Sequence, residues 1–196
     1  MSEKLIVINA GSSSLKFNVY QIPDAETVDV NDLSYLYGGQ VSGIGTDIAH
    51  FKVKGALGQI LEDRSTTFDE TKDLQAAQEL LANWLTFRMD KPAIAVGHRI
   101  VHGGSDMDDS AVIDDQLLTY LDDLAPLAPL HQHNNLAPVR VIRKHWPQIL
   151  QIACVDTAFH CHQDPLYNHY ALPLRYYDQG VRRYGFHGLS YQYISD

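Results

Sequence analysis

The sequence contains little of what several classes of protein require. Its two cysteines, Cys154 and Cys161, are too few for a disulfide framework and agree with a reducing compartment. No apolar run is long enough to cross a bilayer, and residues 1–4 lack the basic and apolar phases of a signal peptide. We therefore expect a cytoplasmic protein with no membrane partner.

Basic residues are also scarce. The chain has 15 Lys and Arg against 24 Asp and Glu, a formal net charge of -9, and the basic residues form no run. Such a surface would repel a phosphate backbone, which argues against nucleic acid as a partner. What the chain does have is apolar: 45% of its 196 residues are hydrophobic, enough for a sizeable core. Because no repeat or linker divides it, we expect one continuous α/β unit.

The first third of the chain has the patterns of β-strands. Residues 4–9 are apolar at their centre, as in a strand buried on both faces, whereas residues 15–20 alternate apolar and polar side chains. Residues 33–41 and 48–53 indicate further strands. The loop Gly11-Ser12-Ser13-Ser14 before Lys16 approaches a P-loop but lacks its second glycine and the Ser or Thr after the lysine. Because strand patterns flank it on both sides, we expect the loop to join one strand to the next.

The middle of the chain changes period. Thr67 and Glu70 have the spacing of a capping box, and apolar residues then recur at three and four positions, which predicts one amphipathic helix of about five turns. Strands are expected at residues 93–101 and 149–155, and helices at 115–124 and 135–146. Strands that alternate with helices predict a partly parallel sheet, which binds ligands at the carboxyl ends of its strands.

Polar residues collect where three of these strands end. The segments are 9–14, 98–104 and 156–160. Because the carboxyl ends of parallel strands share one edge of a sheet, we expect the three segments to converge on one rim.

Five segments in this order resemble the N-terminal half of the acetate kinases, in the sugar kinase, Hsp70 and actin superfamily. They are Asn9-Ala10-Gly11-Ser12-Ser13-Ser14-Leu15-Lys16-Phe17, Gly97-His98-Arg99-Ile100-Val101-His102-Gly103-Gly104, Leu127-Ala128-Pro129-Leu130-His131, Asp156-Thr157-Ala158-Phe159-His160 and Arg182-Arg183-Tyr184-Gly185-Phe186-His187-Gly188. The resemblance implies a ribonuclease-H-like α/β fold, a mixed sheet flanked by helices. It also implies that residues 1–196 form a single N-terminal domain and that the C-terminal nucleotide-binding domain is absent.

The resemblance implies a phosphotransferase with a carboxylate acceptor. Such an enzyme converts ATP and acetate to ADP and acetyl phosphate by direct in-line transfer and uses Mg²⁺. The resemblance assigns Asn9 to the magnesium site, and Ser12, Ser14 and Lys16 to the phosphates of ATP. A serine-rich hairpin turn with a surface lysine is the alternative for this segment.

The other predicted site residues follow from the same resemblance. Arg99 would hold the substrate carboxylate, because its planar fork donates two parallel hydrogen bonds. Val101 and Leu130 would contain the acetate methyl group, Asp156 would orient the magnesium, and His187 would stabilise the transferring phosphoryl group. The alternatives are a structural ion pair for Arg99, core packing for Val101 and Leu130, a turn cap for Asp156 and a loop position for His187.

Two histidine patterns suggest zinc, but the sequence argues against both. His98 and His102 have the spacing of a zinc-binding pair, yet their segment has the pattern of a strand, and Arg99 stands where such sites have glutamate. The cluster Cys154, His160, Cys161, His162 lacks a second pair of ligands at zinc-site spacing.

The chain also departs from the family pattern. Gln132-His133 stands where the family has Asn-Pro, and Leu189 and Tyr191 replace the Thr and His of its Gly-Thr-Ser-His motif. Family members are about twice as long, so we expect the isolated chain to be weakly active or inactive. The alternatives are a non-catalytic half that binds phosphate or acyl phosphate, and a propionate kinase. A homodimer or a separate C-terminal half is the expected protein partner.

Overall fold

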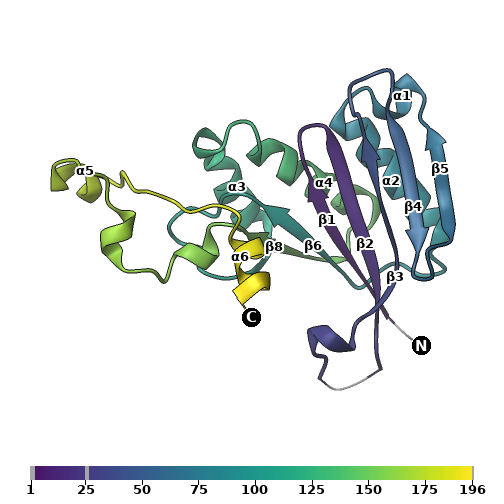
Figure 1. The fold of residues 1–196 in the computed structure, drawn as a ribbon, viewed down its shortest axis with the longest axis horizontal. Helices are drawn as coiled ribbons and strands as arrows, with labels where there is room; N and C mark the ends of the chain where they lie inside the picture. Colours follow the sequence, from purple (N-terminus) through teal and green to yellow (C-terminus); the bar gives the residue numbers. More distant parts are fainter. Residues whose placement is uncertain (1–2, 25–26, 196) are drawn as a thin grey trace.

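The computed structural model describes residues 3–24 and 27–195. Within these residues the chain forms one mixed sheet of eight strands in the order β5-β4-β3-β2-β1-β6-β8-β7 (Figure 1). β6 pairs in parallel with β1 and β8, and the other neighbours are antiparallel, so the predicted partly parallel sheet is confirmed. The strands are β1 (Glu3–Ala10), β2 (Ser14–Ile22), β3 (Ser34–Ser42), β4 (His50–Gly55), β5 (Ile60–Ser65), β6 (Ala95–Ile100), β7 (Ala111–Val112) and β8 (Leu150–Val155).

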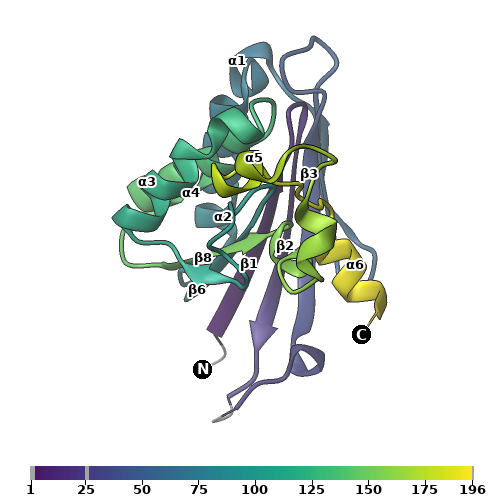
Figure 2. The same ribbon diagram turned by 90° about the vertical axis from the view of Figure 1, so that its left-hand side faces the viewer.

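Helices cover the two faces of the sheet unequally. Figure 2 shows α2, α3 and α4 on one side of the sheet and α6 on the other, where α6 contacts β8. The segment with η4 and α5 extends away from the sheet (Figure 1). In the described part of the chain no helix has both the length and the apolar character to cross a bilayer. The helices are η1 (Val30–Asp32), α1 (Phe68–Thr71), α2 (Leu74–Arg88), α3 (Asp115–Asp123), η2 (Ala125–Leu127), α4 (Gln132–His145), η3 (Ala158–His160), η4 (Pro165–Asn168), α5 (Leu174–Asp178) and α6 (Gly188–Ser195).

The core lies between the sheet and the helices α2 and α4. The alternation in β2 turns Leu15, Phe17 and Val19 into this layer, where Phe17 packs edge-on against Trp84 of α2 at 5.9 Å between ring centroids. A second cluster around Leu136 of α4 packs under β6 and β8. Together these clusters hold the carboxyl ends of β1, β6 and β8 in fixed positions.

The helix predicted after Thr67 is wrong as a single element. The capping box closes only the four-residue α1, because Asp73 is the N-cap of a separate helix, α2. The Asp73 carboxylate accepts a hydrogen bond from the N–H of Ala76 at 2.8 Å. The chain therefore turns between Thr71 and Leu74 rather than continuing as one helix.

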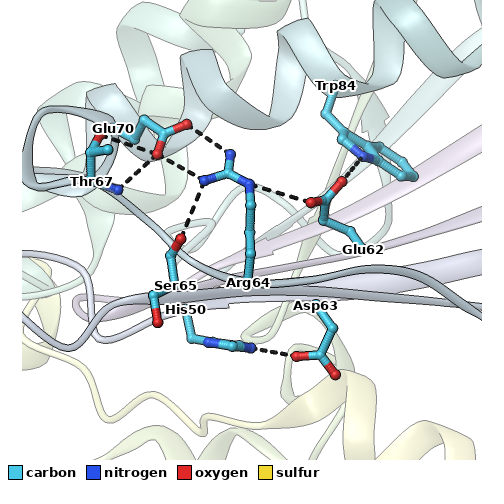
Figure 3. A network of polar contacts seen from close by, with 8 residues as sticks. All are labelled: His50, Glu62, Asp63, Arg64, Ser65, Thr67, Glu70 and Trp84. Atoms are coloured by element: carbon cyan, nitrogen blue, oxygen red, sulfur yellow. Dashed lines mark hydrogen bonds and ion pairs between the residues drawn. The ribbon is translucent and has the colours of Figure 1, made fainter.

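Strand β5 was not predicted from the sequence, because it carries charged rather than alternating apolar side chains. Tertiary contacts hold it in place (Figure 3). Arg64 donates to both carboxylate oxygens of Glu70 at 2.9 and 2.7 Å, and Trp84 donates its indole N–H to Glu62 at 3.1 Å. These polar contacts join the edge strand to α1 and α2.

Candidate functional site

The three polar segments converge, as predicted, at the carboxyl ends of β1, β6 and β8. Together with residues 127–131, the first turn of α4 and the segment before α6, they line a cleft of about 620 Å³. Among the predicted site residues, this cleft gathers Asn9, Ser12, Ser14, Arg99, Val101, Leu130, Asp156 and His187.

Arg99 is at the centre of the polar contacts in the cleft. Its Nη2 lies 2.7 Å from Oδ2 of Asp156, and its Nε lies 3.2 and 3.3 Å from the two oxygens of that carboxylate. Nη1 lies 3.5 Å from Oδ1 of Asn9, and Nη2 lies 3.3 Å from Nδ1 of His187. The contacts to Asp156 are close and charge-assisted, whereas those to Asn9 and His187 are long.

Asp156 is the buried member of this group, with its side chain 1% exposed against 30% for Arg99. It follows β8 directly, and its N–H donates to the carbonyl of Ile100 at 2.9 Å, which fixes the end of β8 beside β6. The ion pair that the sequence offered as an alternative for Arg99 is therefore present. It occupies only one edge of the guanidinium.

His187 reaches the cleft through an unusual backbone. Its φ is 58°, in the left-handed region that side chains other than glycine rarely adopt. Because an arginine N–H can only donate, the 3.3 Å contact makes Nδ1 of His187 the acceptor. In the neutral ring the proton then sits on Nε2, which can donate to a ligand.

The glycine–serine loop, residues 11–14, is a tight hairpin turn. The N–H of Gly11 donates to the carbonyl of Ser14 at 2.8 Å, and the hydroxyl-bearing Ser12 and Ser13 are exposed. Lys16 does not line the cleft. It lies on the exposed face of β2, in a neighbouring groove of about 550 Å³ that it shares with Asn9, Lys52 and Lys54. Asn9 is common to both hollows.

Val101 and Leu130 form part of an apolar wall of the cleft, with Leu127 and Phe186. Leu130 is 75% exposed, so core packing does not account for it. Val101 is half-buried, and its N–H donates to Oδ1 of Asn135 at 2.9 Å. The sequence interpretation did not include Asn135, which it took only as the start of a helix.

Neither histidine pattern forms a metal site. Within the described ranges, no three His, Cys, Asp or Glu side chains are grouped closely enough to hold a metal ion. His98 is buried in the core, where its Nε2 pairs with Oε1 of Gln151 at 2.8 Å, and burial lowers its pKa to about 4. His102 accepts a hydrogen bond at Nδ1 from the N–H of Gly104 at 2.9 Å, and burial lowers its pKa too.

We expect Gly188→Ala to destabilise the fold by about 1–3 kcal/mol through overpacking. A Cβ at position 188 would lie 2.0 Å from the carbonyl oxygen of Asp156 and 2.6 Å from Cβ of Phe159, so α6 would have to move away from the end of β8. Chemical denaturation measures the loss. Gly97→Ala is the control, because its Cβ would meet nothing closer than 4.0 Å. Equal stability of the two variants would contradict the prediction.

Comparison with known proteins identifies relatives over nearly the whole chain. A model of the acetokinase family matches residues 4–196. The acetate kinase of Rhizobium meliloti is 44% identical over 194 residues, which are 99% of this chain and 48% of that protein. The acetate kinase of Nitrobacter hamburgensis is 41% identical over 193 residues, 98% of this chain and 46% of that protein.

Solved structures give the same result. An acetate kinase from Porphyromonas gingivalis superposes with a TM-score of 0.80 at 32% identity, and a propionate kinase from Francisella tularensis with a TM-score of 0.80 at 28% identity. Each match covers 98% of this chain and 47% of the other. The chain therefore spans about half the length of the relatives it matches.

Proposed function

The chain belongs to the acetokinase family, and from this premise we propose that it supplies the N-terminal half of an active site that transfers a phosphoryl group between ATP and acetate. The observation that carries the proposal is the position of Arg99 in the cleft, with Asp156, Asn9 and His187 around one guanidinium. A single cation is thus held by a buried carboxylate, and its other contacts, to Asn9 and His187, are long enough for an anion to replace them.

The geometry of Arg99 suits a carboxylate or an acyl phosphate. Nε and Nη2 are engaged by Asp156, which fixes the plane of the guanidinium. The remaining edge has only the long contacts to Asn9 and His187, which a bound anion can replace with shorter, charge-assisted ones. Phosphoryl transfer needs positioning and positive charge more than covalent help from the protein, and Arg99 offers both.

The oxygen donors in the cleft fit a magnesium ion. Oδ1 of Asn9 and Oδ1 of Asp156 have only contacts of 3.3 Å or longer to Arg99. Mg²⁺ is usually bound by one or two carboxylates, with substrate phosphates and water completing the shell. When bound, it would neutralise charge on the phosphates. Asn9 and Asp156 would hold it, and the hydroxyls of Ser12 and Ser14 would contact the phosphoryl group.

Two further side chains extend this scheme. His187 would donate from Nε2 to the transferring phosphoryl group, which places a hydrogen-bond donor where negative charge develops. Lys16 would reach the nucleotide phosphates from the neighbouring groove, close to Asn9. The apolar wall with Val101 and Leu130 would contain the acyl chain, and acetate or propionate would both satisfy its chemistry.

We expect the 196-residue chain alone to have negligible kinase turnover. The groups that stabilise the transition state come from both halves of a family enzyme and act together. One half alone therefore retains far less than half of the stabilisation. The test is to incubate the purified chain with ATP, Mg²⁺ and acetate and to trap acetyl phosphate with hydroxylamine. A full-length family enzyme is the positive control. Turnover comparable to that enzyme would contradict the expectation.

The same assay distinguishes the two forms of the proposal. Addition of a separately produced C-terminal half of a family enzyme should restore product if the chain is a catalytic half. Equilibrium binding of acetyl phosphate without product, even in that mixture, would favour a binding module. No binding of acetyl phosphate, acetate or Mg²⁺–ATP under any of these conditions would refute the proposed function.

A further inference from the structure

Asn135 is a buried amide that joins two walls of the cleft. Its side chain is 4% exposed and lies in the first turn of α4. Its Nδ2 donates to the carbonyl oxygen of Ala10 at 2.7 Å, and its Oδ1 accepts from the N–H of Val101 at 2.9 Å. One side chain therefore connects the residue before the glycine–serine loop to the segment that follows Arg99.

This bridge stands where the sheet no longer joins the two segments. The parallel register between β1 and β6 ends at the pair Ile8 and His98. Beyond this pair β1 and β6 are no longer paired, and the cleft opens between Asn9 and Arg99. Ala10 lies two residues beyond Ile8 and Val101 three residues beyond His98, and Asn135 supplies hydrogen bonds that the ladder no longer provides.

The rest of α4 makes this bridge rigid. Leu136 and Val139 are fully buried in the second core cluster, so the helix cannot shift without disturbing the core. Gln132, in the same first turn as Asn135, donates to the carbonyl oxygens of His102 and Leu121 at 2.8 and 3.0 Å. The first turn of α4 thus holds the segments around the cleft through buried amides.

We propose that Asn135 is a positioning residue: it fixes the spacing between the glycine–serine loop and Arg99, and thereby sets the affinity of the cleft for an acyl phosphate. The choice of ligand rests on the proposed function, whereas the bridge itself does not. An amide is required because the position needs a donor and an acceptor at once. Alanine supplies neither, and an ionised aspartate supplies only acceptors.

The first measurement needs no ligand. In Asn135→Ala, the N–H of Val101 loses its acceptor, so we expect its hydrogen exchange to accelerate by roughly tenfold or more, together with that of the glycine–serine loop. His133→Ala, in the same helical turn but exposed, is the matched control. Unchanged exchange at Val101 and the loop in Asn135→Ala would overturn the inference, whatever the chain binds.

The second measurement is a titration with acetyl phosphate. We expect Asn135→Ala to bind roughly tenfold more weakly than wild type, a loss of about one buried hydrogen bond. His133→Ala should bind like wild type. If wild type and Asn135→Ala bind equally, the inference is wrong and the proposed function stands. If wild type binds nothing while exchange at Val101 and the loop accelerates in Asn135→Ala, the proposed function is wrong and the positioning role is supported.

Asn135→Asp keeps the experiment informative if the alanine variant does not fold. Protonated, the new carboxyl can donate to Ala10 and accept from Val101; ionised, it repels the carbonyl oxygen of Ala10. Because burial favours the neutral acid, we expect wild-type affinity at about pH 5 and roughly tenfold weaker binding at about pH 8. The other titratable groups of the cleft, Arg99, His131, Asp156 and His187, are shared with wild type, so each affinity is compared with wild type at the same pH. A ratio independent of pH would overturn the inference.

Discussion

Arg99→Ala is expected to weaken the binding of acetyl phosphate by roughly 100-fold or more, because charge-assisted hydrogen bonds are the strongest that a side chain offers a small anion. The guanidinium is the only cationic side chain in the described part of the chain that lies within hydrogen-bond distance of both Asn9 and Asp156. Lysine cannot replace its planar fork, so Arg99→Lys should also bind poorly. Isothermal titration measures both losses.

Arg99→Ala should also lower the stability of the fold. It leaves the carboxylate of Asp156 buried without the arginine that pairs with it. Loss of one partner of a buried ion pair is strongly destabilising, but Arg99 is 30% exposed, so we reduce the expected cost to about 2 kcal/mol. Chemical denaturation at neutral pH measures this cost.

A double substitution separates the two effects. Arg99→Ala with Asp156→Asn removes the unpaired charge, so stability should recover while binding stays lost. If the double variant regains affinity, Arg99 only neutralises Asp156 and does not bind the anion. Wild-type affinity in Arg99→Ala alone would equally contradict its role as the anion site.

The position of the site could be predicted because it follows from topology. Apolar runs and alternating patterns identified β1, β2, β6 and β8, and parallel strands bring their carboxyl ends together regardless of side-chain detail. The convergence of Asn9, Arg99 and Asp156 therefore needed only the strands to be recognised. The helix boundaries were less certain because caps such as Asp73 compete with the capping box at Thr67.

Other features depend on contacts between distant residues, which periodicity does not reveal. β5 has no alternating apolar pattern that would reveal it. It is held instead by an ion pair and by a hydrogen bond from a tryptophan of α2. Asn135 resembles any polar residue near a helix start until its two backbone partners, Ala10 and Val101, are seen. Lys16 is different: Leu15 and Phe17 point inward, so a period of two already directs Lys16 to the exposed face of β2, where it lines the neighbouring groove and not the cleft.

The buried histidines predict how stability depends on pH. The pKa of His98 is lowered by burial to about 4 in the folded chain, against 6.5 when exposed. Above pH 6.5 the ring is neutral in both states, so stability is fully present. As the pH falls from 6.5 to 4, His98 becomes protonated in the unfolded chain but stays largely neutral in the folded chain. The free energy of unfolding therefore falls by about 3 kcal/mol.

The range from about pH 6.5 to 5 isolates this effect from the carboxylates. Glu70, for example, has its pKa lowered to about 2 by Arg64, so its contribution is lost only between pH 4.5 and 2. His102, whose pKa is lowered by burial, adds in the same direction as His98. The measurement is the free energy of unfolding by urea at several pH values in this range.

His98→Gln should reduce this pH dependence to the part that His102 contributes, since glutamine can still donate to Gln151 but cannot take up a proton. His133→Gln, at an exposed position of α4, should leave the slope unchanged. Burial of the neutral His98 ring lowers the free energy of unfolding only below about pH 6.5, where the ring is protonated in the unfolded chain. A wild-type stability that is constant from about pH 6.5 to 5, or a slope in His98→Gln equal to that of wild type, would show that the ring accepts a proton in the folded chain. His98 would then have a charge-stabilising partner in the core, contrary to its contact with an amide alone.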